Sequence, residues 1–160
     1  MSRNDFNKAC ENGDIETVTK LLDDFDPSFL QNYAIRLASR NGHVDIVRLL
    51  LEDSRVDPSS VDNDAIRYAS RQGHADVVRV LLLDPRVDPT DKDNYAIRHA
   101  SRFGHIEVVR LLLQDPRVKS TVFYEQAIQN ADKNGYTEIV DLLTQHQFRL
   151  DGPEYNKNIL

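Results

Sequence analysis

Apolar and polar positions recur along the chain in blocks of about 31 residues. In the middle blocks, a first stretch spaces small and aliphatic residues one and four positions apart, as in Ala34, Ile35 and Ala38. A second stretch opens with an acidic residue and carries apolar residues at helical spacing, such as Ile46, Val47 and Leu50. A glycine follows the first stretch and a proline-containing segment follows the second, and both end helices. The pattern predicts an all-α chain with two short helices in each block.

The glycines that close the first stretches mark the repeat. Their spacings are 29, 31, 31 and 31 residues, at Gly13, Gly42, Gly73, Gly104 and Gly135. A period of this length is typical of a solenoid, in which each unit buries its apolar face against its neighbours. We therefore expect one domain over 1–160, made of an N-terminal capping unit, three internal units, a C-terminal capping unit and a tail. The expected ranges are 1–31, 32–62, 63–93, 94–124, 125–146 and 147–160.

An asparagine precedes the first stretch of each internal unit, at Asn32, Asn63 and Asn94. An asparagine side chain can accept hydrogen bonds from the free N–H groups of a first helical turn. The sequence therefore predicts these residues as N-caps. Val56, Val87 and Val118, which follow the second stretches, are the expected buried residues of the connecting segments.

These motifs resemble a known repeat family. The pattern G-H-x-[DE]-[VI]-V-R-[LV]-L-L, preceded by [YD]-A-I-R-x-A-S, is similar to the ankyrin repeat from Phe6 to about His146. The 31-residue period and the Pro-Arg-Val-Asp-Pro segment resemble ankyrin arrays of large DNA viruses and some protists. The resemblance implies a solenoid of stacked helix-turn-helix units with short hairpin loops. It also implies a non-catalytic scaffold that binds a partner protein through a concave face of hairpin tips and first helices.

Residues that differ between the otherwise similar units are candidates for contact with that partner. Several are aromatic, and aromatic side chains supply large, rigid contact area. Drift at unconstrained surface positions, or packing between units, would explain the same variation. The predicted partner-binding residues are Arg40, Tyr68, Arg71, Tyr95, His99, Arg102 and Phe103.

Arginine recurs at two positions of the first stretches. Arg36, Arg67 and Arg98 are expected to bond carbonyls or acids of neighbouring hairpins, such as Asp57, Asp62, Asp88 and Asp93. One helical turn further on, Arg40, Arg71, Arg102 and Lys133 are expected to line up as a basic stripe. The stripe is interpreted either as a carboxylate- or phosphate-binding track, or as a solvated face balanced by nearby acids.

The charge of the chain bears on which kind of ligand the stripe could bind. The chain carries 20 basic and 26 acidic residues, a formal charge of −6, which disfavours general nucleic-acid binding. The segment 94–124 is nevertheless basic, with five cationic and two acidic side chains. An anion- or nucleic-acid-reading module that uses the stripe is therefore one rival hypothesis. The other is a homo-oligomer that associates through Val122–Tyr124 or the concave face, although we expect a monomer.

The C-terminal tail carries apolar residues that could cover the last unit. A terminal unit of a solenoid exposes a core face that needs cover. We therefore expect the tail to fold back rather than to bind a partner. The residues concerned are Phe148, Leu150, Tyr155, Ile159 and Leu160.

Residues suited to catalysis or metal binding do not gather in the sequence. His43, His74 and His105 recur only at the repeat spacing, about 10 Å apart, too far to share a zinc ion. We expect no catalytic, cofactor-binding or metal-binding residues, and we expect Cys10 to pack as a hydrophobe. A single cysteine, with no secretory signal or apolar membrane span, predicts a cytoplasmic protein, in the host cytoplasm if the source is viral.

Overall fold

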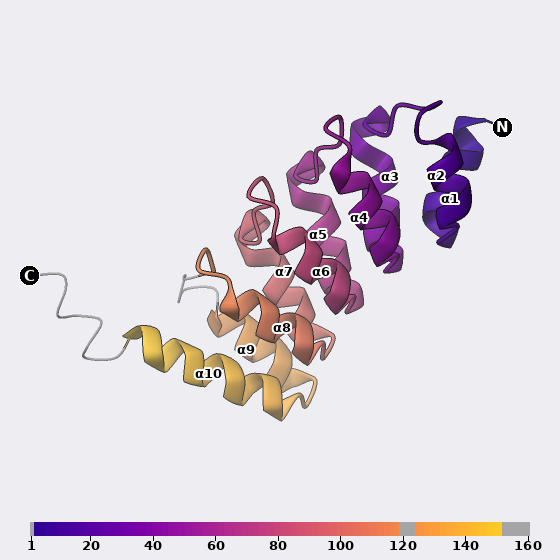
Figure 1. Ribbon diagram of the computed structural model, residues 1–160. Coiled ribbons are helices and arrows are strands. Elements are labelled where there is room, and N and C mark those ends of the chain that lie inside the picture. The colour runs from indigo at the N-terminus through magenta and orange to yellow at the C-terminus, as the bar shows by residue number, and fades with distance from the viewer. Residues whose placement is uncertain (1, 119–123, 152–160) are drawn as a thin grey trace, which may run out of the picture.

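The computed structural model describes residues 2–118 and 124–151 (Figure 1). Within these ranges the chain forms ten α-helices and no strand. The helices are α1 (Arg3–Asn12), α2 (Ile15–Leu21), α3 (Phe29–Asn41), α4 (Val44–Glu52), α5 (Ser60–Gln72), α6 (Ala75–Leu82), α7 (Asp91–Arg102), α8 (Ile106–Gln114), α9 (Tyr124–Lys133) and α10 (Thr137–Asp151).

The helices form five antiparallel pairs that stack side by side in two layers (Figure 1). The first helices pack against one another in the order α1, α3, α5, α7 and α9, and the second helices in the order α2, α4, α6, α8 and α10. Each pair therefore contacts chiefly the pairs before and after it. The predicted all-α solenoid of stacked helix pairs is confirmed.

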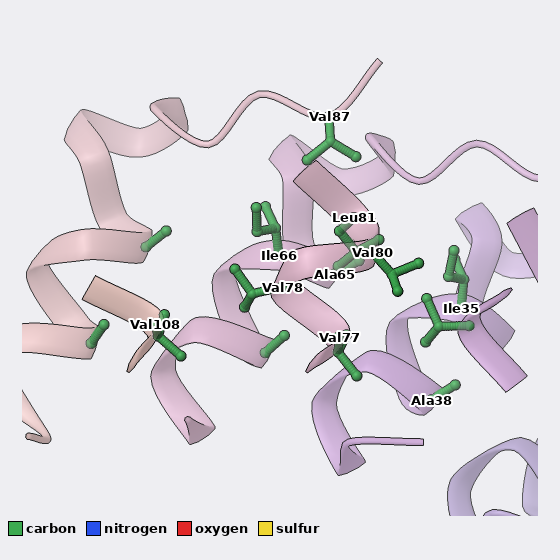
Figure 2. Close-up of a cluster of buried hydrophobic side chains, with 14 of the residues drawn as sticks. Ile35, Ala38, Ala65, Ile66, Val77, Val78, Val80, Leu81, Val87 and Val108 are labelled. Atoms are coloured by element: carbon green, nitrogen blue, oxygen red, sulfur yellow. The ribbon is translucent and has the colours of Figure 1, made fainter. Parts of the chain in front are cut away.

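The apolar positions of the repeat form the interior between the layers. Ile35 and Ile66 of the first helices and Val78 and Leu81 of α6 are all 0% exposed (Figure 2). Burying an aliphatic side chain of this size stabilises a fold by roughly 1.5–3 kcal/mol. The small residues at Ala38, Ala69 and Ala100 let neighbouring first helices approach closely. The connecting valines that the sequence predicts as buried, Val56, Val87 and Val118, are at most 2% exposed.

A histidine at the start of each internal second helix joins its unit to the one before. The Nε2 atoms of His43, His74 and His105 donate to the carbonyl oxygens of Glu11, Arg40 and Arg71, at 2.8, 3.0 and 2.9 Å. The ring lies against the glycine that ends the preceding first helix. A Cβ atom on Gly42, for example, would stand 2.6 Å from Nδ1 of His74. These histidines are therefore structural links between units.

The asparagines predicted as N-caps have a different role. Asn32, Asn63 and Asn94 each end a turn of three residues with left-handed φ angles, of which 30–32 is the first. Oδ1 of Asn32 accepts from the backbone N–H of Asp57, and its Nδ2 donates to Ser60 of the next unit. Asn63 bonds Asp88 and Asp91 in the same way. The N-cap prediction is wrong: all three asparagines have φ 57°, outside the extended range typical of an N-cap, and the side chains of Asn32 and Asn63 bond the following hairpin instead.

A buried tyrosine ends the described part of the fourth unit. Tyr124 is 1% exposed, and its hydroxyl donates to the carbonyl of Val118 at 2.9 Å. It is thus not available for association through Val122–Tyr124, one of the two surfaces that the homo-oligomer hypothesis named. Val122 and Phe123 lie outside the described residues.

The last helix continues beyond residue 146 to Asp151. Phe148 on this helix is 78% exposed, so it does not cover the core as the tail prediction expected. The side chain of Leu150 and all of Tyr155, Ile159 and Leu160 lie outside the described part of the chain.

Candidate partner-binding surface

The outward side of α3, α5 and α7 gathers all seven predicted partner-binding residues, and we call it the first-helix face. Its arginines form an inner row, Arg36, Arg67 and Arg98, and an outer row, Arg40, Arg71 and Arg102. Equivalent residues of successive units lie on neighbouring helices because the first helices pack directly against one another. The rows therefore cross the three internal units.

The guanidinium groups of the inner row donate to acceptors within the protein. Nε of Arg36 donates to Oδ2 of Asp64 at 2.7 Å, and Nη2 of Arg67 donates to Oδ1 of the same carboxylate at 3.0 Å. Arg98 donates to the backbone carbonyls of Asp93 and Lys92, at 2.7 and 3.1 Å. The expectation that this row bonds neighbouring acids and carbonyls is confirmed, although Asp64 is an acid that it did not name.

The outer row is held by aromatic rings. The guanidinium carbon of Arg40 lies 5.4 Å from the ring centroid of Tyr68 in the next unit. Those of Arg71 and Arg102 lie 5.7 and 5.6 Å from the ring of Phe103. Each contact is within the range of a cation–π interaction. Among the described residues, no carboxylate forms a salt bridge with any of these three arginines, which are all exposed.

Aromatic rings form a continuous line along α7. Tyr95 stacks on His99 with 3.8 Å between ring centroids, and His99 contacts Phe103 at 6.1 Å. Burial, and to a smaller extent the charges of nearby arginines, lowers the pKa of His99 to about 4; these arginines are Arg98, Arg71, Arg102 and Arg67. His99 is therefore neutral at pH 7 and lies in a positive electrostatic environment. Phe103 is 40% exposed and is thus open to contact from outside.

A small cup of about 120 Å³ opens on the same face between α3 and α5. It lies beside the first member of the outer row. The lining residues are Tyr33, Arg36, Leu37, Arg40, Asp64 and Tyr68. The cup can hold several water molecules, since one needs roughly 10–15 Å³ of such space.

Two further residues at positions that differ between the units are buried. Asp64 is 7% exposed and Leu37 is 8% exposed. Tyr68 and His99 are only partly exposed. Reasoning from the sequence therefore missed Asp64, Tyr33 and Leu37 as parts of the site. The variation between Tyr33, Asp64 and Tyr95 at one repeat position could have indicated that this position belongs to the site.

Both arginine rows stop at the capping units. Asn7 and Gln129 take the place of the inner row in the first and last units. Glu11 and Lys133 take the place of the outer row. Paired rows of three arginines thus belong to the internal units.

Other chemistry is sparse in the part of the chain that the structure describes. No group of three or more His, Cys, Asp or Glu side chains is arranged there to hold a metal ion. Burial raises the pKa of the Cys10 thiol to about 12, so the thiol stays protonated and packs in the core. No described helix combines the length and apolar character needed to cross a bilayer.

The fold and its surface define a helical-repeat solenoid with a basic and aromatic face. Residues 6–93, more than half of the chain, match the family described as ankyrin repeats (3 copies), and the chain belongs to that family. Ankyrin repeats are generally protein–protein interaction modules and are typically non-catalytic. The match does not bear on the resemblance to viral and protist arrays, which stays a prediction. No curated protein matches the chain.

Proposed function

We propose that the protein is a non-catalytic scaffold that binds a partner protein through the first-helix face. The observation that carries this proposal is the outer row. Three exposed guanidinium groups have aromatic rings as neighbours and no carboxylate partner in the described chain. Arginine and aromatic residues are enriched among the few residues that contribute most of the binding energy at protein interfaces.

The second helices offer a weaker candidate surface. A shallow groove of about 370 Å³ lies there between α4 and α6, beside Leu83, which is 79% exposed. It has one exposed aliphatic residue and no aromatic side chain in its lining. The first-helix face therefore remains the better candidate.

The proposal is tested by capture of a partner from cells of the native source, followed by mass spectrometry. The double variant Arg71→Glu with Arg102→Glu should abolish capture, because it reverses both charges beside Phe103. Its free energy of unfolding should change by no more than about 2 kcal/mol, because each of the two exposed cation–π contacts that it removes is worth about 0.5–1 kcal/mol. The matched control is Arg48→Glu with Arg79→Glu, which makes the same charge change at exposed positions of α4 and α6.

Two results would refute the proposal. Equal capture by the Arg71→Glu, Arg102→Glu variant and the unaltered protein would exclude the first-helix face. A large loss of stability in that variant would show that the arginines of the outer row stabilise the fold rather than bind a partner. For the predicted monomer, light scattering at high concentration is the direct measurement.

A further inference from the structure

The outer row presents positive charges at regular intervals. Its three arginines lie on α3, α5 and α7, which pack in sequence. Packed helix axes are about 8–10 Å apart. The row therefore has one cation about every 10 Å across the internal units.

An extended polypeptide matches this interval. A polyproline II segment rises about 3.1 Å per residue and has three residues per turn, so every third side chain lies on the same side, about 9 Å from the next. Resting on the proposed function, we propose that the first-helix face binds an extended acidic segment of its partner, in which a carboxylate recurs at every third residue. Its carboxylates pair with Arg40, Arg71 and Arg102.

The inner row is already bonded within the protein, which leaves the outer row to bind the ligand. Asp64 already accepts from Arg36 and Arg67, and Arg98 is engaged with backbone carbonyls. Charge-assisted bonds of this kind hold an arginine in place, so the inner row is less able to bind a further carboxylate. Within residues 2–118 and 124–151, no hydrogen bond or salt bridge engages the guanidinium groups of the outer row, so their N–H groups can donate to a carboxylate that arrives from outside.

The first carboxylate has a defined place to bind. The cup between α3 and α5 lies at Arg40, and the side chains of Tyr33 and Tyr68 line it. Asp64 lines it too, and its negative charge is compensated by the two inner-row arginines that bind it. Tyrosine hydroxyls donate hydrogen bonds, so they can complement the arginine at a carboxylate. At the other end, the exposed ring of Phe103 lies between Arg71 and Arg102 and can contact an apolar side chain next to the third carboxylate.

Spaced carboxylates fit this surface better than a nucleic acid does. A nucleic-acid strand carries a charge at every nucleotide and gains affinity from many phosphate contacts. Here the outer row has three arginines with Lys133 at the same position in the last unit, and Glu11 stands at that position in the first unit. The exposed Asp62 and Asp93 add negative charge at the hairpins beside the rows. A ligand with neutral residues between its acids avoids this repulsion.

Two synthetic peptides of about nine residues test the spacing. One repeats the triplet Asp-Leu-Ser, and the other has the same composition with its three aspartates adjacent. Binding to the full chain is followed by ¹⁵N NMR titration at about 0.15 M salt, including the Arg Nε–H signals. A third peptide with Asn in place of Asp measures the contribution of charge, and oligothymidylate of similar length tests the nucleic-acid alternative.

We expect the spaced peptide to bind at least about fivefold more tightly than the clustered one, the size of one or two exposed ion pairs. Arg71→Glu with Arg102→Glu should abolish binding, and Arg48→Glu with Arg79→Glu should leave it unchanged. Equal affinity for both aspartate peptides, binding to neither, or tighter binding of oligothymidylate would overturn the inference. Partner capture that depends on the first-helix face, combined with any of these results, would leave the proposed function intact and reject only this ligand.

Discussion

Arg36 and Asp64 join two successive units through a hydrogen bond of 2.7 Å from Nε to Oδ2. The side chain of Asp64 is only 10% exposed, and Arg67 binds its other oxygen. The carboxylate therefore compensates two partly buried guanidinium groups at once. It also sets the charge of the cup that the outer row borders.

Replacing Asp64 should affect stability and ligand binding in opposite directions. Asp64→Asn leaves two partly buried arginines without a counter-charge, which should cost about 1–3 kcal/mol of unfolding free energy. The same change makes the face more positive, so the spaced aspartate peptide should bind more tightly. Urea denaturation and the peptide titration measure the two effects.

The matched control for Asp64→Asn is Asp62→Asn. Asp62 forms an exposed ion pair with Lys92 at 2.9 Å, and pairs of this kind contribute less than about 1 kcal/mol. A variant at Asp64 that is no less stable than the one at Asp62 would contradict the role assigned to the buried carboxylate.

His99 should make the protein less stable as the pH falls from about 6.5 to 4. In the unfolded chain His99 takes up a proton near its ordinary pKa of 6.5, whereas in the folded protein its pKa is lowered to about 4. Between these values the unfolded state binds more protons, so acid favours unfolding. Thermal unfolding of the unaltered protein and of His99→Gln at pH 7 and pH 4.5 measures the effect, which the variant should reduce.

The contributions of other titratable groups to the pH dependence can be distinguished from that of His99 by a companion variant or by the pH at which the groups titrate. Burial also lowers the pKa of His146, so His146→Gln is the companion variant. Hydrogen bonds from Arg86 and Arg117 lower the pKa values of Asp84 and Asp115 below 3.8, so their contribution is lost at lower pH. An unchanged pH dependence in His99→Gln would show that folding does not lower the pKa of His99.

Variants at Gly42 and Gly135 can distinguish two reasons why glycine is favoured at a position: a left-handed backbone and a lack of space for a Cβ atom. Both have φ near +80°, at 81° and 76°, where any L side chain is strained. A Cβ on Gly42 would also meet the ring of His74, whereas a Cβ on Gly135 would have no atom within 4 Å. Gly135→Ala should cost about 1–2 kcal/mol, and Gly42→Ala should cost more. Chemical denaturation of both variants measures the difference, and adding His74→Ala to Gly42→Ala should remove part of it.

Val61 is the residue least suited to its backbone conformation. It has φ 57° and ψ 55°, a left-handed geometry that is costly for β-branched residues. Val61 is also 37% exposed, so glycine would lose little packing there. Val61→Gly should raise the midpoint of thermal unfolding, with a gain of about 1 kcal/mol. Arg79→Gly, at an exposed right-handed position of α6, should lower it by about 1 kcal/mol; equal losses in both variants would contradict this reasoning.

The sequence predicted the helix pairs because their apolar spacing depends on local geometry repeated several times. It placed Ala34, Ile35 and Ala38 on a buried face and predicted Val56 as buried, as observed. It misassigned Asn32, because the choice between capping its own helix and bonding Asp57 depends on where the next hairpin lies.

For the candidate site, the sequence identified the two arginine rows and the aromatic residues but not how they are held. Asp64 occupies the position of Tyr33 and Tyr95, and its burial depends on Arg36 of the preceding unit. Phe103 could be identified as variable, but its position between Arg71 and Arg102 depends on the stacking of α5 on α7. Contacts that cross from one unit to the next are thus the part that local patterns do not contain.

The cup between α3 and α5 has a consequence for the direction in which a ligand lies. Three similar units would let a periodic ligand shift by one unit or turn end for end at little energetic cost. The junction of α3 with α5 has a hollow and a buried acid, while the junction of α5 with α7 has Tyr95 stacked on His99. This difference breaks the near-symmetry of the array, so we expect a bound chain to have one favoured alignment and one favoured polarity.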